Sequence, residues 1–404
     1  MKKKVNFLKE VNKVYNEKNP SVYFRDYKKI QRFIDNRKNF LLNLKLPHKI
    51  FENSSLIDFG CGSGQNTITY DWLGSNCTMI EYDKNSCINA GKLFKRFSKN
   101  KYKIINENIF NFRNIKKYDF VISNGVVHHT HNPKKNIKIC CNALKKGGFF
   151  ILGVGEKNGF FQRNIQRLIL YNISNNNSDI IKYSKILFKD HLNRSIKFGG
   201  RTIDEVIFDT YINPKIDTLS TSEIIKEFSK NKLLLYSSNE TLKNIKSFTN
   251  PFMTQFKLMG KKNFLNYKFE DSLIFNPLHN LSLSNQGLYK IKEISQFLKM
   301  NESIKKIVKK VNNNNNFTTL KNVPIKDLIN LKKTIHKLKK VQVIDINHNK
   351  IFINEMMSIF KILNSKMLKV KKFHKIKKIL KNSKKIFKGF NGIGMSYFVG
   401  YKPK

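Results

Sequence analysis

A run of glycines around position 60 is the part of the sequence whose residue types and spacing are best suited to chemistry. An apolar stretch ends at Asp58, and Gly60, Gly62 and Gly64 follow it at intervals of two residues. Glycine can adopt positive φ angles and lets a ligand approach the main-chain amides closely. Residues 65–67 then begin a predicted helix, whose first N–H groups can bind a polar ligand. The pattern predicts a buried strand, a tight turn and a helix that together hold a nucleotide-type cofactor.

An acidic residue follows the next apolar run at a distance that suits the same cofactor. Residues 77–80 form that run, and Glu81 follows Asp58 by 23 positions, near the ~20 residues expected for a carboxylate that binds ribose hydroxyls. A carboxylate accepts two hydrogen bonds in that role. Asp83 is close enough to be the ribose ligand instead, although we favour Glu81, and Tyr82 between them is grouped with the cofactor site. The alternative for both acids is a solvated loop position.

A second ordered motif occupies residues 118–130, which read YDFVISNGVVHHT. Pro133 predicts the start of the next helix, because proline suits the first helical turn. That helix is expected to end at Gly147 and Gly148, before another apolar strand at residues 149–154. Short apolar runs that alternate with helical segments predict a parallel sheet covered by helices on both faces.

The glycine pattern, residues 118–130 and the turn at residues 144–148 resemble, in the same order, the motifs of class I S-adenosylmethionine (SAM)-dependent methyltransferases of the type 11 and type 12 groups. The resemblance covers residues 54–154 and implies an α/β, Rossmann-like fold with a mostly parallel, seven-stranded sheet. It implies SAM as the cofactor and S-adenosyl-L-homocysteine as the product. The cofactor-binding residues that we expect are Asp58, Gly60, Cys61, Gly62, Gly64, Glu81, Tyr82, Asn108 and Asn124.

The resemblance also implies roles for individual residues. Asn108, with Glu107 as its rival, corresponds to the position that binds the adenine amino group, although it also fits a structural loop asparagine. The backbone around Asn124 would face the methionyl part of SAM. Asp58 would bind near that end or hold the glycine turn, and Cys61 is expected to be a small packing residue.

Three histidines are candidates for a general base. His128 and His129 directly follow the fourth predicted strand, and His191 lies in a polar segment further along the chain. Imidazole suits proton uptake near neutral pH. The alternative for the first two is loop packing, and an acceptor such as a phenol or an amine needs little help from a base.

The acceptor is less well defined than the cofactor. Ser123 and Asn124 stand where many amide-nitrogen methyltransferases carry an NPPY-type tetrapeptide, which favours a small molecule, a lipid or a glycan as the acceptor. One alternative is an RNA methyltransferase that uses the basic C-terminal region. Another is a SAM-binding interaction protein without catalysis.

Composition adds a large positive charge. The formal net charge is +49, from 77 Lys and Arg against 28 Asp and Glu. Such an excess suggests RNA or an anionic membrane surface as a partner, but lysine is spread along the whole chain, which is also typical of an AT-rich coding sequence. The five cysteines form no paired C-x-x-C motifs, so we expect no metal site. Without a signal-like or membrane-spanning apolar segment, the expected location is cytoplasmic, with peripheral membrane association as an alternative.

The expected organisation has five parts: an N-terminal helical cap over residues 1–50, a SAM-binding core over 51–154, a substrate-lid insertion over 155–230, a return to the sheet over 231–260, and a lysine-rich, mainly helical region over 261–404. Residues 232–236 are predicted as the sixth strand. The last strand is either 255–259 or 395–401, and we favour the second. Residues 366–387 form a basic amphipathic segment, which we interpret as a helix that faces a core, with membrane-surface or nucleic-acid binding as alternatives.

Overall fold

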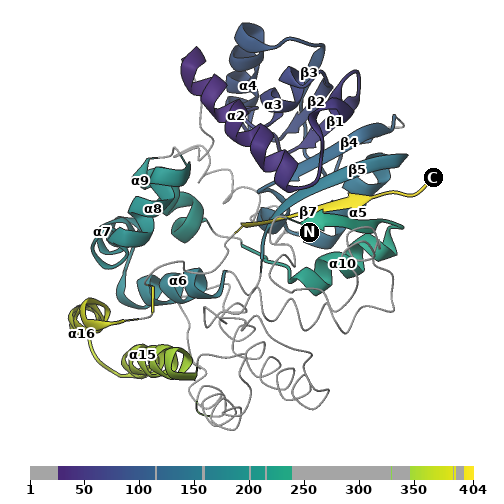
Figure 1. Cartoon of the computed structure of the whole chain (residues 1–404). Helices are drawn as coiled ribbons and strands as arrows, with labels where there is room; N and C mark the ends of the chain where they lie inside the picture. The colour runs from purple at the N-terminus through teal and green to yellow at the C-terminus, as the bar shows by residue number, and fades with distance from the viewer. Residues whose placement is uncertain are drawn as a thin grey trace, which may run out of the picture.

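A single sheet organises the half of the molecule that contains the predicted cofactor site (Figure 1). The computed structural model of the 404-residue chain describes residues 26–113, 116–156, 160–199, 202–213, 216–238, 329, 346–384, 386–387 and 395–404. Within these ranges the seven-stranded sheet has the order β3-β2-β1-β4-β5-β7-β6. Its strands are β1 Ser55–Phe59, β2 Asn76–Glu81, β3 Tyr102–Asn106, β4 Tyr118–Asn124, β5 Leu144–Gly155, β6 Leu234–Ser238 and β7 Met395–Tyr401.

The strand directions confirm the predicted mostly parallel sheet. Strands β1 to β5 pair in parallel, and β7 runs antiparallel between β5 and β6. The prediction of a last strand at residues 395–401 is confirmed by β7, while the alternative at 255–259 lies outside the described residues. The sixth strand is confirmed two residues later than predicted, at Leu234–Ser238.

Helices cover both faces of the sheet, as expected. One face packs against α2 Tyr27–Asn43, α3 Thr67–Trp72 and α4 Lys84–Phe97. The other packs against α5 Pro133–Ala143 and α10 Thr221–Lys230. Successive side chains of β4 point to opposite faces of the sheet. Phe120 and Ile122 pack in the core on the side of α2, α3 and α4, and Val121 packs in the core on the side of α5 and α10. Short helices η1 His48–Phe51 and η2 Val127–His129 lie before β1 and after β4.

Local capping fixes where several of these helices begin. Asn132 accepts a hydrogen bond from the amide of Lys135 at the start of α5, with Pro133 as the first helical residue. At α10 a capping box is present: Ser220 accepts from the amide of Glu223 at 3.3 Å, and Glu223 accepts from the amide of Ser220 at 2.8 Å.

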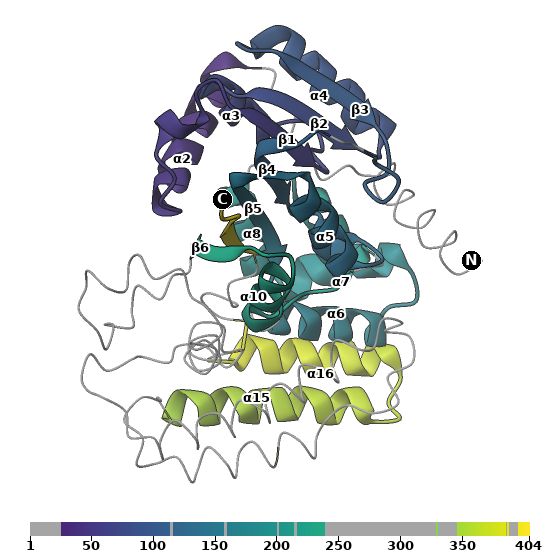
Figure 2. The same cartoon turned by 90° about the vertical axis from the view of Figure 1, so that its right-hand side faces the viewer.

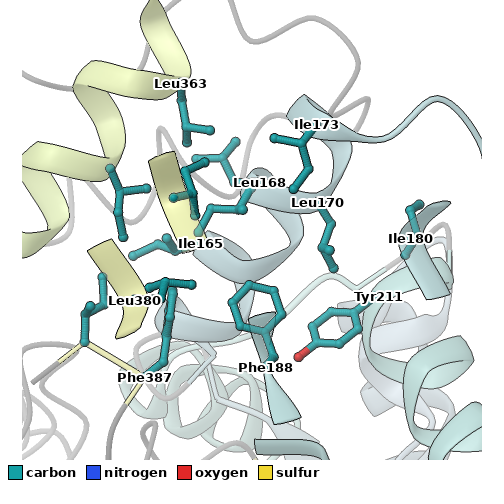
Figure 3. Packing of buried hydrophobic residues seen from close by; sticks show 14 of the residues in the cluster. Ile165, Leu168, Leu170, Ile173, Ile180, Phe188, Tyr211, Leu363, Leu380 and Phe387 are labelled. Atoms are coloured by element: carbon teal, nitrogen blue, oxygen red, sulfur yellow. The ribbon is translucent and has the colours of Figure 1, made fainter. Parts of the chain in front are cut away.

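A second unit, whose described elements are helices, lies beside the sheet. We call this unit the cap (the described residues of 160–213 and 346–387), and it is distinct from the predicted N-terminal helical cap over residues 1–50. Its helices are α6 Phe161–Ile173, α7 Asn177–Leu187, α8 Lys189–Gly199, α9 Ile203–Ile207, the π-helix η3 Phe208–Ile212, α15 Ile346–Asn364 and α16 Lys369–Asn382. In Figure 2, α16 lies between α6 and α15. Side chains from both segments of the chain share one hydrophobic core, including Leu168, Phe188, Tyr211, Leu363 and Leu380 (Figure 3). The insertion after β5 is therefore packed against the C-terminal helices, which precede β7 in the chain.

The basic amphipathic segment faces this core. Phe373, Ile376, Leu380 and Phe387 are buried in it, whereas most lysines of α16 are exposed. Among the described helices, none combines the length and the apolar character that crossing a bilayer would require. The first 25 residues of the predicted N-terminal helical cap and most of the region 261–345 lie outside the described residues.

Candidate functional site

The glycine turn has the backbone geometry that its sequence predicts. Gly60, Gly62 and Gly64 have φ angles of 79°, 57° and 76°, a region that favours glycine. A Cβ atom on Gly60 would collide with the side chain of Val126, and one on Gly64 would lie 2.9 Å from Cε2 of Phe94. The turn is therefore held close both to the loop after β4 and to α4, and side chains would not fit between them.

Asp58 lies buried at the end of β1, directly before this turn. One carboxylate oxygen accepts a 2.6 Å hydrogen bond from the hydroxyl of Thr67, the first residue of α3. The other oxygen, Oδ1, is buried and has no hydrogen-bond partner. Burial raises the pKa of Asp58 to about 7, the nearby Glu81 adds to the increase, and the bond from Thr67 and the charge of Arg37 oppose it. Asp58 thus holds the turn and also presents an unused acceptor.

Arg37 of α2 lies next to Asp58, and the sequence analysis did not single it out. Its Nε and Nη2 atoms are buried without hydrogen-bond partners, and its guanidinium stacks on Phe40 and Tyr397 at 4.6 and 5.3 Å from the ring centroids. Burial alone would lower the pKa of Arg37, but Tyr397, Tyr70 and Asp58 outweigh it and raise the pKa. The only sequence feature that could have indicated it is its place on the helix expected to cover the cofactor edge.

Glu81 is joined to the glycine turn. Its two carboxylate oxygens accept hydrogen bonds from the amide of Gly62 at 2.8 Å and the amide of Asp83 at 2.9 Å. Burial raises the pKa of Glu81, and the backbone N–H groups oppose that shift. The carboxylate of Asp83 accepts from the amide of Ser86 and caps α4, so it already has a structural task. Tyr82, between the two acids, has an exposed ring.

The asparagines predicted for adenine and methionine occupy the same edge of the sheet. The side-chain oxygen of Asn108 accepts from the amide of Phe110 at 2.9 Å and so stabilises its own loop, and Glu107 donates its amide to the carbonyl of Glu81. Asn124 ends β4. The following residue, Gly125, has a φ of 78°, and a Cβ there would meet no atom within 4 Å. Open space therefore adjoins the end of β4.

The three histidines have different surroundings. His128 is buried, and its Nδ1 accepts the amide proton of Gly155 at 3.1 Å, which requires a neutral ring. Burial, followed by the nearby His129 and Arg163, lowers the pKa of His128 well below its usual range. The ring of His129 is tilted by 45° to that of His128, with ring centroids 4.1 Å apart, and its Nε2 lies 3.7 Å from a carboxylate oxygen of Asp209. His191 lies in the cap, where its Nδ1 is 2.8 Å from the hydroxyl of Tyr211.

Cys61 fills space within the glycine turn. It is buried, and burial raises the pKa of its thiol well above the usual range. A thiol with that environment is a poor nucleophile, which agrees with a packing role. Over the described parts of the chain, no group of three or more His, Cys, Asp and Glu side chains is arranged to hold a metal ion.

Parts of the chain are similar to known proteins. Residues 57–152 match the profile of the methyltransferase domain family. No curated protein sequence matches the chain. A solved SAM-dependent methyltransferase from Clostridium acetobutylicum is 23% identical over 34% of this chain and 54% of that one, with a TM-score of 0.27, so this chain spans about half the length of that protein.

Two further solved structures are similar to parts of the chain. The first is magnesium protoporphyrin IX methyltransferase from Synechocystis with bound S-adenosylhomocysteine, at 14% identity over 58% of this chain and 87% of that one, with a TM-score of 0.33. The second is 1,6-didemethyltoxoflavin-N1-methyltransferase from Burkholderia thailandensis, at 17% identity over 33% and 56%, with a TM-score of 0.26. The family match assigns residues 57–152 to the methyltransferase domain family, and the sheet order and the glycine turn have the features expected from the sequence for a SAM-binding domain.

Proposed function

We propose that the whole protein transfers the methyl group of SAM to a small-molecule, lipid or glycan acceptor. The observation that supports this best is a pair of unused groups beside the glycine turn: the Oδ1 acceptor of Asp58 and the Nε and Nη2 donors of Arg37. Buried polar groups are costly unless they are paired. An amino-acid zwitterion, such as the methionyl end of SAM, carries an ammonium for the first and a carboxylate for the second.

The remaining contacts with SAM would be made by residues at the same edge of the sheet. Glu81 would accept hydrogen bonds from the ribose hydroxyls through lone pairs that the amides of Gly62 and Asp83 do not use. Asn108 would meet the adenine, with Tyr82 alongside it, and the open space at Gly125 would receive the methionyl chain after Asn124.

When bound, SAM supplies a methyl group that its sulfonium already activates. The task of the protein is then to bind the donor, align the acceptor and exclude water, so positioning provides much of the rate. The cap adjoins the loop after β4 through Asp209, which makes its inner side the natural place for the acceptor.

The experiment that tests the proposal measures binding and transfer separately. Calorimetry with SAM and S-adenosylhomocysteine should detect binding to the wild type. Glu81→Ala should weaken that binding about 10- to 100-fold, because hydrogen bonds to a charged group contribute about 1.5–3 kcal/mol. Asp35→Ala, on the exposed side of α2, is the matched control. No binding to folded wild-type protein would refute the proposal.

Transfer is then followed with methyl-labelled SAM and fractionated lysate, so that label in metabolites, lipids or polysaccharides identifies the acceptor class. Label confined to RNA would support the basic surface of α16 as a binding site instead. On that helix the apolar side is buried in the cap while lysines such as Lys371, Lys375 and Lys378 are exposed. RNA is therefore the anionic partner to test for α16, because the side that would enter a bilayer is already occupied.

A further inference from the structure

The π-helix η3 is held by an unusual number of buried hydrogen bonds. Three side chains of α6 bind it: Arg167 donates to the carbonyls of Thr210 and Asn213 at 3.1 and 2.9 Å, Tyr171 donates to the carbonyl of Tyr211 at 3.0 Å, and Gln166 accepts from the hydroxyl of Tyr211 at 3.1 Å. His191 of α8 binds the same hydroxyl. Short π-helical segments are frequent at functional sites.

This network fixes the direction of two neighbouring side chains on η3. Tyr211 points into the core of the cap, beside Phe188 (Figure 3). Asp209 points out of it, toward the loop after β4, where its carboxylate lies 3.7 Å from Nε2 of His129. The side chains of His129 and Asp209 are 11% and 25% exposed, so their electrostatic interaction is only partly screened by solvent.

His128 cannot share this arrangement. Its Nδ1 is occupied by the amide of Gly155, and its ring is held neutral by burial. The ring of His128 instead packs against the ring of His129, with an angle of 45° between the two ring planes. The backbone of His128 is held as well, because the amide of Asp217 donates a hydrogen bond to its carbonyl. Of the two adjacent histidines, His129 is therefore the one with a carboxylate partner.

We infer that His129 is the general base of the reaction and that Asp209, supplied by the cap, is the residue that positions it. The inference rests on the methyl transfer proposed above and narrows its acceptor to one that must lose a proton, such as a hydroxyl group. In this assignment Nε2 of His129, the nitrogen 3.7 Å from Asp209, carries the proton of the neutral ring, and Nδ1 takes up the proton of the acceptor.

The step balances without a further reagent. The acceptor O–H bond breaks and its proton moves to Nδ1 of His129, while the acceptor oxygen forms a bond to the donor's methyl carbon. The carbon–sulfur bond breaks, and sulfur keeps its electron pair. The resulting imidazolium is stabilised by the carboxylate of Asp209 until the proton passes to solvent.

The test begins with the titration of His129 in the full chain, observed by NMR of histidine-labelled protein and assigned with His129→Gln. Asp209→Asn should move the midpoint of that titration to lower pH, because a carboxylate favours the charged imidazole. Asp190→Asn, an exposed acid of the same cap, should leave it in place. Among the described residues, the titratable or charged groups near the pair are His128, Arg163, which acts on the pKa of His128, and Asp217, whose amide binds the carbonyl of His128, and all three stay the same in both variants.

Activity gives the second readout, measured on the lysate fraction that the wild type labels. His129→Gln should reduce labelling at least 100-fold while SAM binding is retained. Asp209→Asn should reduce it about tenfold and shift the acidic limb of its pH profile in the same direction as the NMR midpoint. An unchanged midpoint and profile in folded Asp209→Asn would overturn the inference while leaving the proposed function intact. Loss of SAM binding by the wild type would overturn the proposed function itself.

Discussion

Two arginines show how differently the cap and the sheet edge satisfy buried guanidinium nitrogens. Arg167 in the cap donates to two backbone carbonyls of η3. Arg37 at the sheet edge has buried Nε and Nη2 atoms without hydrogen-bond partners, next to an equally unused oxygen of Asp58. Since a buried polar group costs free energy unless it is paired, the first arrangement is complete within the protein. Under the proposed function, the second is completed by the amino-acid end of the bound SAM.

The sharpest test of this difference replaces each arginine by methionine. Arg167→Met removes the donor for the carbonyls of Thr210 and Asn213, and each buried carbonyl left unpaired costs about 1–3 kcal/mol. We therefore expect the free energy of unfolding of the cap to fall by about 4 kcal/mol. Hydrogen exchange of the cap amides at increasing urea concentrations measures this free energy. SAM binding by the sheet should persist wherever the variant remains folded. A variant as stable as the wild type would contradict the structural role of Arg167.

Arg37→Met should show the opposite pattern. Nε and Nη2 of Arg37 make no hydrogen bonds that the substitution would break, so the free energy of unfolding should fall by less than in Arg167→Met. The affinity for SAM should nevertheless fall about 100-fold, or about 2.7 kcal/mol, because the carboxylate of the ligand loses its donors. Calorimetry measures both quantities on the same sample. Equal affinities of Arg37→Met and wild type would remove Arg37 from the site.

The sequence could predict the sheet edge because its chemistry depends on neighbours in the chain. The positive φ angles of Gly60 and Gly64, the acid before them and Glu81 after the next strand lie within one βαβ unit. Arg37 could not be predicted in the same way. Its role depends on Asp58 and on Tyr397 of β7, which only the folded sheet brings to it.

The cap illustrates the same limit on a larger scale. Periodicity predicts the amphipathic helix that contains Phe373 and Ile376, but no local pattern says that it packs on α6, far earlier in the chain. Periodicity also assigns lysines to solvated faces. Lys372 is an exception, because its Nζ donates to the carbonyl of Leu363 at 2.9 Å and to the side-chain oxygen of Asn172 at 3.0 Å.

Adjacent lysines on α16 therefore give a third test. Lys372→Met removes two hydrogen bonds that join α16 to α15 and α6, and the free energy of unfolding of the cap should fall by about 2 kcal/mol. Lys371→Met, at an exposed position, should change it by less than about 0.5 kcal/mol. Thermal unfolding of the two variants under the same conditions compares them directly. Equal effects would mean that the burial of Lys372 contributes nothing to the cap.

The smallest expected effect is the pH dependence of stability and of ligand affinity that arises from Asp58 at the sheet edge. The pKa of Asp58 is raised to about 7 from its ordinary value of 3.8, mainly by burial. Because the folded form binds this proton more tightly than the unfolded form, its contribution to folding stability is present at low pH and is lost as the pH rises from about 4 to about 7. Ligand binding should depend on pH in the opposite direction, since an ammonium group is attracted by the carboxylate and not by the neutral acid.

The affinity for S-adenosylhomocysteine should therefore fall as the pH drops below 7, by up to tenfold, or about 1.4 kcal/mol, for each unit. Calorimetry between pH 5.5 and pH 8 measures this slope in the wild type. Asp58→Asn should bind weakly with a much flatter profile, and its stability relative to the wild type should increase over the window in which Asp58 would ionise. Parallel profiles for the two proteins would show that Asp58 only holds the turn through Thr67, and Arg37 would then be the one member of the pair that waits for a ligand.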